Sequence, residues 1–148
     1  MLLVHVGRKT GVRRRTPLNY AVVAQDIYCV AAFGKISDWH KNILECREVE
    51  VWLPDGWWSG IATDVSNSDS RLPLLRKVLI ASGFAAYAAG IRPTTMSDAE
   101  LARLTVDYRV LRIARTHRSE WPRRPVLGLA RCDASVVGGA RTPLARVE

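Results

Sequence analysis

Residues 17–33 have the sequence PLNYAVVAQDIYCVAAF, and this stretch decides the class of fold. It contains two runs of β-branched and aromatic residues, at residues 17–24 and 27–33, separated only by Gln25 and Asp26. Two such runs joined by two polar residues predict a β-hairpin. We therefore expect an antiparallel sheet, and Gly34 ends the second strand of the hairpin.

Similar patterns on both sides of the hairpin predict four more strands and three helices. The strands are expected at residues 2–6, 49–53, 57–65 and 108–114. The helices are expected at residues 38–46, at residues 72–91 with an interruption at Gly83, and after the capping-box sequence SDAE at residues 97–100. This order predicts a mainly β (α+β) fold, a small antiparallel barrel with helices packed on its outside, and excludes a doubly wound parallel sheet.

The chain has 148 residues, of which 48% are hydrophobic and 24% charged, as expected for one globular domain. We expect the domain to occupy residues 1–114, because residues 115–148 change to arginine, proline and glycine and are predicted to form a basic tail. The apolar stretch at residues 72–91 is broken by Arg76 and Lys77, so it is too short for the roughly 20 residues of a membrane-spanning helix. No secretory signal is recognised at the N-terminus, which favours a cytoplasmic protein.

The net charge of +8 is concentrated at the two ends of the chain. Residues 1–25 carry five basic side chains and no acidic one, and residues 115–148 carry seven basic and three acidic side chains. The segment between them is nearly neutral. Such basic clusters indicate an anionic partner, which is a phosphate, a polycarboxylate, a nucleic acid or a membrane surface.

The most informative basic segment is GRKTGVRRRTP at residues 7–17. Gly7 and Gly11 allow a turn whose successive backbone N–H groups face an anion, and Thr10 adds a hydroxyl donor. The spacings of the Walker loop and of the Rossmann fingerprint are absent. Either a binding site for negative charge or a solvated basic hairpin fits this composition.

Together with later blocks, this segment resembles the deazaflavin-dependent nitroreductase and quinone reductase family, whose members are split-barrel proteins that use coenzyme F420. The resemblance rests on GRKTG at residues 7–11 with Arg14 and TPL at 16–18, on VAAFG at 30–34 leading to DW at 38–39 and Asn42, and on VEV at 49–51. It covers about residues 2–114. It implies an FMN-binding split-barrel-like fold and coenzyme F420 as the cofactor, with FMN as the alternative.

The cofactor that the resemblance implies agrees with the charge pattern. Coenzyme F420 joins a flat, hydride-carrying ring to a tail that bears a phosphodiester and several glutamates, so its tail is a polyanion. Among the implied binding positions, residues 8–11 and 14 match the tail, residues 32–34 border the ring, and residue 35 lies near the phosphate. The full predicted set is Arg8, Lys9, Thr10, Gly11, Arg14, Pro17, Leu18, Ala32, Phe33, Gly34, Lys35 and Trp39. For Trp39, an ordinary core aromatic is the alternative.

The implied activity is hydride transfer from the reduced deazaflavin to a quinone, a nitroaromatic compound or an activated alkene. Tyr20, Tyr87 and Tyr108 are candidates for a catalytic proton donor, and ordinary core or surface tyrosines are the alternative. No metal is expected, because the three histidines are far apart in sequence and no Cys-x-x-Cys spacing exists.

Other functions compete with a reductase. A carrier would bind coenzyme F420, or FMN, without turnover. A nucleic-acid-binding barrel would use the basic ends, but the aromatic residues are not interleaved with the arginines. We therefore expect a small-molecule electron acceptor and no nucleic acid. The chain is expected to be a monomer or a homodimer, and an outward tryptophan of the pair Trp57 and Trp58 would suit a peripheral membrane contact.

Overall fold

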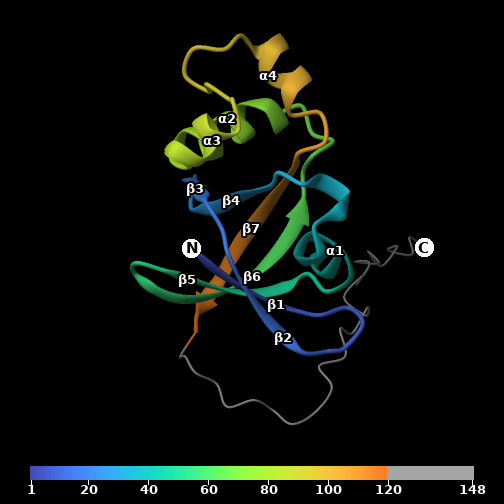
Figure 1. Ribbon diagram of the computed structural model, residues 1–148. Helices are drawn as coiled ribbons and strands as arrows, with labels where there is room; N and C mark the ends of the chain where they lie inside the picture. The colour runs from blue at the N-terminus through green and yellow to red at the C-terminus, as the bar shows by residue number, and fades with distance from the viewer. Residues whose placement is uncertain (120–148) are drawn as a thin grey trace, which may run out of the picture.

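The computed structural model describes residues 1–119, apart from the side chain of Lys35. Seven strands form one antiparallel sheet in the order β2-β1-β5-β6-β7-β4-β3, and the sheet curls around a core (Figure 1). The strands are β1 (Leu2–Val6), β2 (Arg13–Pro17), β3 (Tyr20–Val23), β4 (Asp26–Ala31), β5 (Glu48–Leu53), β6 (Gly56–Asp64) and β7 (Arg109–Arg118). This is the mainly β architecture with packed helices that the sequence predicts.

The hairpin predicted from residues 17–33 is confirmed as β3 and β4. The two strands pair in antiparallel register from Tyr20 opposite Cys29 to Val23 opposite Asp26. The intervening residues, Ala24 and Gln25, have φ angles of 49° and 73°. Positive φ at both central positions matches the twist of a two-residue hairpin loop, so the right-handed twist of the strands outweighs the usual preference of these two residues.

Residues 13–17 form an edge strand that sequence analysis did not predict as one. β2 pairs along its whole length with β1, from Val6 opposite Arg13 to Leu2 opposite Pro17. Three consecutive arginines are not typical of a strand, and they are ordered here by backbone pairing with β1. Charged side chains and a proline also suit an exposed edge, because they discourage pairing with another sheet.

Two hydrophobic cores lie on opposite faces of the sheet. The first core lies inside the curl and includes Leu3, Ile27, Cys29, Ile43, Val49, Val51, Leu53, Ala62, Leu111 and Ile113. The second core lies on the other face of β4 and β7, under the helical layer, and includes Leu75, Leu79, Ala86, Ile91, Leu101 and Val110. The strict alternation in β4, where Ile27 and Cys29 enter one core while Tyr28 and Val30 enter the other, separates the two.

The helices divide into one that packs inside the curl and a layer at one end of the molecule (Figure 1). α1 (Asp38–Glu45) follows a short 3-10 helix, η1 (Gly34–Ile36), and packs against β1 and β6. The layer consists of α2 (Arg71–Ala81), α3 (Phe84–Ala88) and α4 (Asp98–Leu104). No helix within residues 1–119 is both long and apolar enough to cross a membrane.

The signals that sequence analysis assigned to helix ends are largely confirmed. Gly83 separates α2 from α3 with a φ of 54°, and the hydroxyl of Ser97 accepts a hydrogen bond from the Glu100 amide at the start of α4. At the start of α1, Ser37 occupies the N-cap position, but its side chain makes no capping hydrogen bond. The start of α1 is therefore held by other contacts, which belong to the site described below.

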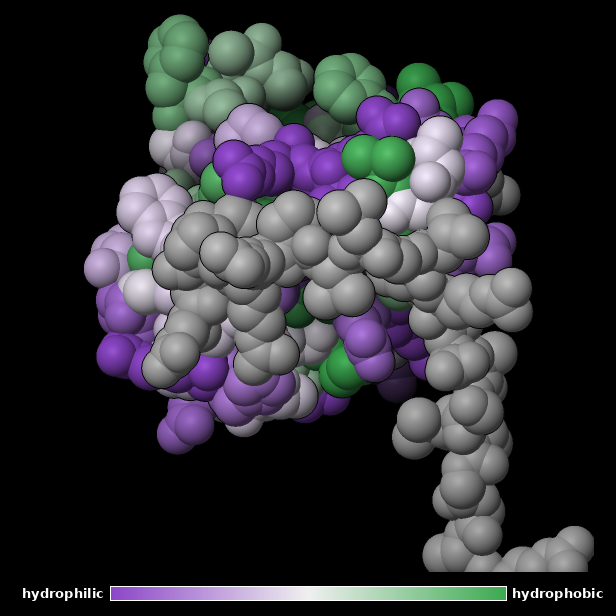
Figure 2. Space-filling view, turned by 90° about the horizontal axis from the view of Figure 1, so that it is seen from below, coloured by the Kyte–Doolittle hydropathy of each residue, from purple (hydrophilic) through white to green (hydrophobic). Residues whose placement is uncertain are grey.

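The layer also carries exposed hydrophobic side chains. Phe84 is 84% exposed on α3, with Ile80 and Tyr87 each about half exposed beside it in sequence. On the face seen from below, hydrophobic residues gather toward one edge and hydrophilic residues cover much of the rest that is visible (Figure 2).

The last strand is longer than predicted. β7 continues to Arg118, four residues beyond the predicted end at residue 114, and pairs there with β6. Its final residues thus belong to the sheet, although sequence analysis assigned them to the tail. The remainder of the predicted tail, residues 120–148, lies outside the described residues.

A comparison of Gly34, at the start of η1, with Gly83 tests why position 34 requires glycine. Both have a φ near 54°, but a Cβ on Gly34 would lie 2.3 Å from the backbone oxygen of Asp107, whereas a Cβ on Gly83 would meet nothing within 4 Å. We expect Gly83→Ala to lower the free energy of unfolding by about 1–3 kcal/mol, the cost of its backbone conformation alone, and Gly34→Ala to lower it by about 1–3 kcal/mol more, because its side chain also collides with Asp107. Urea denaturation of both variants measures the difference. Equal losses would show that the contact with Asp107 is not what requires glycine.

Candidate functional site

The basic turn between β1 and β2 uses most of its own backbone donors. The Thr10 and Gly11 amides both donate to the Gly7 oxygen, at 3.1 and 2.7 Å, and the Gly7 amide donates to the Val12 oxygen at 2.8 Å. The Val12 amide donates to Thr10 Oγ1 at 3.3 Å. Gly11 has a φ of 65°, which closes the turn. The expectation that successive amides of this turn face an anion is therefore wrong, because the turn consumes them.

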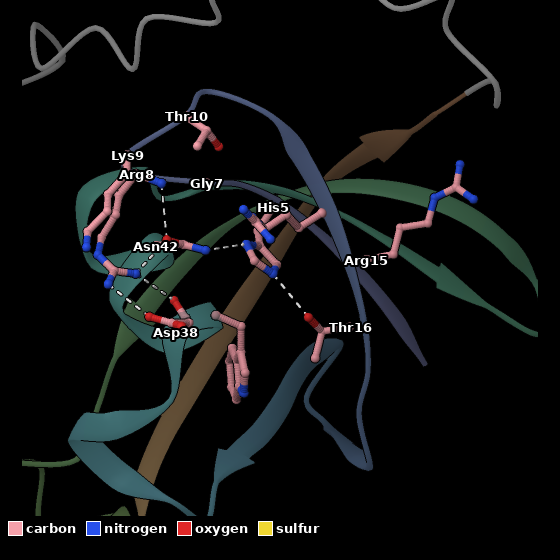
Figure 3. Close-up of a pocket in the computed structure, with 11 residues that line it drawn as sticks. His5, Gly7, Arg8, Lys9, Thr10, Arg15, Thr16, Asp38 and Asn42 are labelled. Atoms are coloured by element: carbon pink, nitrogen blue, oxygen red, sulfur yellow. Dashed lines mark hydrogen bonds and ion pairs between the residues drawn. The ribbon is translucent and has the colours of Figure 1, made fainter.

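Arg8 attaches this turn to α1. Its backbone amide donates to Asn42 Oδ1 at 3.1 Å, and its guanidinium donates to the same oxygen at 2.9 Å (Figure 3). The guanidinium also donates to the carboxylate of Asp38 at 2.9 Å and to the Asp38 backbone oxygen at 3.3 Å. The Arg8 guanidinium holds the pKa of the Asp38 carboxyl below its usual value. The charge of Arg8 is thus already balanced within the protein.

α1 can make these contacts because its polar side chains are spaced by one turn. Asp38 and Asn42 are four residues apart and share one side of the helix. Elsewhere on α1, His40 is buried and its Nε2 lies 2.9 Å from Asp64 Oδ2 on β6. Burial raises the pKa of Asp64, but hydrogen bonds from Ser66 and His40 outweigh it and leave the pKa below its usual value. The pair therefore fixes α1 to the sheet.

The turn, β2 and α1 enclose a cavity of about 410 Å³. Its lining consists of His5, Gly7, Arg8, Lys9, Thr10, Arg14, Arg15, Thr16, Asp38, Trp39 and Asn42. Four of these side chains are basic and only Asp38 is acidic. Within residues 1–119, neither Lys9 nor Arg14 forms an ion pair. The cavity therefore presents positive charge that is available to an anion.

The three arginines of β2 have different surroundings. Arg13 forms an ion pair with Glu50 of β5. Arg14 lies opposite His5 in the ladder and lines the cavity. Arg15 also lines the cavity but extends away from Arg8 and Asp38 (Figure 3). Arg13 therefore has a partner in the sheet, whereas Arg14 and Arg15 line the cavity.

Polar groups inside the cavity connect β1, β2 and α1. His5 is only 2% exposed, its Nε2 lies 3.1 Å from Thr16 Oγ1, and its Nδ1 lies 3.3 Å from Asn42 Nδ2. Burial lowers the pKa of His5, and the charge of Arg14 adds to this, against a backbone hydrogen bond at Val6 that raises it. The imidazole is thus a neutral hydrogen-bonding group at neutral pH.

The structure brings five of the predicted binding residues together at this cavity. They are Arg8, Lys9, Thr10, Arg14 and Trp39. Gly11 lies in the adjoining turn, Leu18 packs against the first core, and Phe33 is 77% exposed beside η1. Pro17, Ala32 and Gly34 do not line the cavity, and the side chain of Lys35 lies outside the described part of the chain. Trp39 is both a cavity wall and partly packed against the first core.

The three candidate tyrosines lie apart from one another, and none lines the cavity. Tyr20 packs against the first core, as Trp39 does. Tyr108 packs against the second core, on the opposite face of the sheet. Tyr87 is about half exposed on α3. Of the three, Tyr20 alone therefore shares a core with a residue of the cavity.

Sequence analysis did not predict that His5, Thr16 and the side-chain amide of Asn42 form hydrogen bonds with one another in the cavity. One signal was present in the sequence. His5 follows Leu3 by two residues in a strand, so it faces the same side as a core residue. A polar side chain at such a position needs hydrogen-bond partners. Which partners it finds could not be predicted, because they come from β2 and α1.

Solved structures with a similar fold support the architecture. A conserved hypothetical protein from Mycobacterium tuberculosis aligns with a TM-score of 0.58 at 16% identity, over 78% of this chain and 72% of that chain. A putative pyridoxamine 5'-phosphate oxidase from Listeria innocua aligns with a TM-score of 0.52 at 11% identity, over 78% and 82%. The heme storage protein HutZ from Vibrio cholerae aligns with a TM-score of 0.51 at 10% identity, over 78% and 80%. At such identities these similarities show the fold alone.

The family comparison is more specific. No curated protein matches the chain. The F420H(2)-dependent quinone reductase family matches residues 1–97, which is well over half of the chain and includes every residue that lines the cavity. This chain therefore belongs to the F420H(2)-dependent quinone reductase family.

Proposed function

We propose that this protein reduces a quinone with a hydride from reduced coenzyme F420, and that Lys9 and Arg14 hold the acidic tail of the coenzyme in the cavity beside α1. The family to which the chain belongs uses coenzyme F420, and its description as a quinone reductase supports a quinone as the acceptor. The observation that carries the proposal for the site is the cavity itself, where basic side chains outnumber acidic ones by four to one.

The chemistry of the side chains fits the tail of the coenzyme. A phosphodiester and several carboxylates need cationic donors, and charge-assisted hydrogen bonds to such groups are stronger than neutral ones. Lys9 and Arg14 supply such donors, and neither forms an ion pair within residues 1–119; Asp38, the acidic residue that lines the cavity, is paired with Arg8. Thr10 adds a hydroxyl, whose oxygen already accepts the Val12 amide and whose proton is therefore left to donate.

Arg8 has a different role in this proposal from the one the resemblance implies. Its guanidinium is occupied by Asp38 and Asn42, so its main contribution is to hold the turn against α1. An anion in the cavity would still be attracted by it, but would compete with a carboxylate that is already in place. The grip on the tail therefore comes mostly from Lys9 and Arg14.

The reduced deazaflavin supplies the hydride when it is bound. The chain's own contribution is to bind the tail, to orient the ring and to keep water from it. Trp39 provides an apolar wall between the cavity and the first core. Tyr20 is the best placed of the predicted proton donors, because it packs against the same core.

The alternatives from sequence analysis remain outcomes for experiment. Nitroaromatic compounds and activated alkenes are electron-poor acceptors that suit the same hydride transfer. A carrier would bind the coenzyme without turnover, and an FMN protein would be yellow on purification. The cytoplasmic location, the peripheral membrane contact and the choice between monomer and homodimer stay predictions from the sequence.

The grip on the tail can be tested by removing one cation at a time. We expect Lys9→Ala and Arg14→Ala each to weaken the binding of coenzyme F420 by roughly 10- to 150-fold, because each loses a charge-assisted contact of about 1.5–3 kcal/mol. Fluorescence titration of the coenzyme measures the affinity. Arg13→Ala is the matched control, since it removes one arginine of the same strand that pairs with Glu50.

The control also separates specific contacts from general attraction. If Arg13→Ala weakens binding as much as Arg14→Ala does, the loss reflects net charge and not contact in the cavity. Affinity unchanged in both Lys9→Ala and Arg14→Ala would reject the cavity as the site of the tail. Tight binding of nucleic acid that falls steeply with salt, without binding of the coenzyme, would instead support the nucleic-acid interpretation.

Turnover distinguishes a reductase from a carrier. We expect the protein to accelerate the oxidation of reduced coenzyme F420 by menadione over the rate of the free coenzyme, and we expect Tyr20→Phe to slow that step by about tenfold or more while the affinity for the coenzyme is retained. Stopped-flow absorbance follows the reaction. Tyr108→Phe is the matched control on the opposite face of the sheet. The absence of acceleration in the unmodified protein would identify a carrier.

A further inference from the structure

We infer that Thr16 is a binding residue of the cavity, and that its hydroxyl is oriented toward an anionic oxygen of the ligand by a chain of hydrogen bonds from Arg8 through Asn42 and His5. The ligand oxygen belongs to a phosphate or a carboxylate. This inference rests on the proposed function, since the anion is the tail of the coenzyme. Each step of the chain follows from the donors and acceptors that meet in the structure (Figure 3).

The chain begins with the orientation of the Asn42 amide. Two N–H donors of Arg8, from the backbone and from the guanidinium, lie 3.1 and 2.9 Å from the same atom of Asn42. Only the amide oxygen can accept both, so the amide nitrogen must be on the other side. That side faces His5. Arg8 therefore fixes which way the amide of Asn42 is turned.

The second step fixes the tautomer of His5. The Asn42 nitrogen presents only protons to Nδ1 of His5, at 3.3 Å, so this contact is a hydrogen bond only when Nδ1 is the bare nitrogen that accepts. A neutral imidazole then carries its proton on Nε2. Nε2 lies 3.1 Å from Thr16 Oγ1 and donates to it. His5 is thus a positioning residue: the orientation that Arg8 gives to Asn42 determines, through His5, that Thr16 Oγ1 accepts a hydrogen bond.

The third step leaves one proton without an acceptor. Thr16 Oγ1 receives the proton of His5, so its own O–H must point elsewhere. Within residues 1–119, the contact with His5 is the only hydrogen bond of the Thr16 hydroxyl, and Thr16 lines the cavity together with Arg14. A hydroxyl held as a donor in a cationic cavity suits an anionic oxygen. Without His5, the same hydroxyl would be free to rotate.

The environment keeps His5 neutral. Besides burial, the charged groups that surround it in the cavity are Arg14 and Arg15 on β2, Arg8 and Lys9 on the turn, and Asp38 on α1. The charge of Arg14 disfavours an imidazolium, and the Asp38 carboxylate is already bound to Arg8. His5 also lines a second cavity, whose charged or titratable residues are Arg13, Glu48, Glu50 and His117. Because the folded pKa of His5 lies below the unfolded value of about 6.5, folding stability from this group falls as the pH drops below about 6.5.

The tautomer can be tested without any ligand. In the free protein at pH 7, the nitrogen-15 NMR shifts of the His5 ring are expected to show a protonated Nε2 and a bare Nδ1. A proton on Nδ1 would require the Asn42 amide to turn over and would overturn the inference. This result is independent of whether the cavity binds coenzyme F420.

The role of Thr16 is tested by affinity for coenzyme F420. We expect Thr16→Val to weaken binding by roughly tenfold, as for a hydroxyl that donates to a charged group. His5→Leu should cost a similar factor, and the double variant should cost no more than either single variant, because both remove one oriented donor. His5→Gln, whose amide can still donate to Thr16, should recover part of the affinity.

Three comparisons make the outcome decisive. Thr10→Val is the matched control, since its hydroxyl lies in the cavity outside this chain, and its effect should add to that of His5→Leu. Additive effects of Thr16→Val and His5→Leu, or full affinity in Thr16→Val, would overturn the inference. If Lys9→Ala and Arg14→Ala still lose affinity in that case, the proposed function stands without it.

The source of the anionic oxygen follows from a shortened coenzyme. With coenzyme from which the glutamates have been removed, a persistent penalty for Thr16→Val identifies the phosphate as the partner. A penalty that disappears identifies a carboxylate. Thermal melting of each variant shows whether it is folded, and if His5→Leu is not, the ring NMR and the pair Thr16→Val and His5→Gln still decide.

Discussion

The attachment of Arg8 to α1 is the interaction on which the site depends. The ion pair with Asp38 is exposed, since the Asp38 side chain is 79% accessible, and an exposed pair stabilises a fold only slightly. The stronger constraint is Asn42, which is 3% exposed and accepts two hydrogen bonds from Arg8 through one oxygen. Removing either partner would leave buried polar atoms unsatisfied, which costs more than the bond itself contributes. The turn is therefore fixed to the helix before any ligand arrives.

This attachment also determines which charges remain for a ligand. Most amides of the turn form hydrogen bonds within the turn, and Arg8 forms an ion pair with Asp38. The remaining arginines of β2 are then divided, so that Arg13 meets Glu50 in the sheet while Arg14 faces the cavity. A run of like charges that repels itself in the unfolded chain is thus separated into Arg13, which is paired within the sheet, and Arg14 and Arg15, which line the cavity. The fold therefore determines which cations can bind a ligand, and the number of basic residues in the sequence does not predict it.

The sequence predicts the parts of this fold whose cause is local. The β3–β4 hairpin, the break at Gly83 and the cap at Ser97 all follow from residues within a few positions of each other. β2 could not be predicted in this way, because Arg13 to Pro17 become a strand only through pairing with β1. In the candidate site, the basic motif was evident, whereas the His5 contacts were not. Their partners are 11 and 37 residues away in the chain. The pairing of β1 with β2 brings Thr16 to His5, and the packing of α1 against β1 brings Asn42.

The same geometry bears on how one cofactor could reach two separated groups of predicted residues. Lys9 and Arg14 line the cavity on one side of the start of α1, and residues 32–35 lead through η1 directly into Asp38. Arg8 binds both the carboxylate and the backbone oxygen of Asp38, so it fixes the distance between the turn and that segment. Gly34 is in turn held against the Asp107 backbone, where no side chain would fit. A ligand that spans the predicted tail and ring positions would therefore meet two segments whose spacing Arg8 fixes, and its binding would cost little rearrangement of the protein.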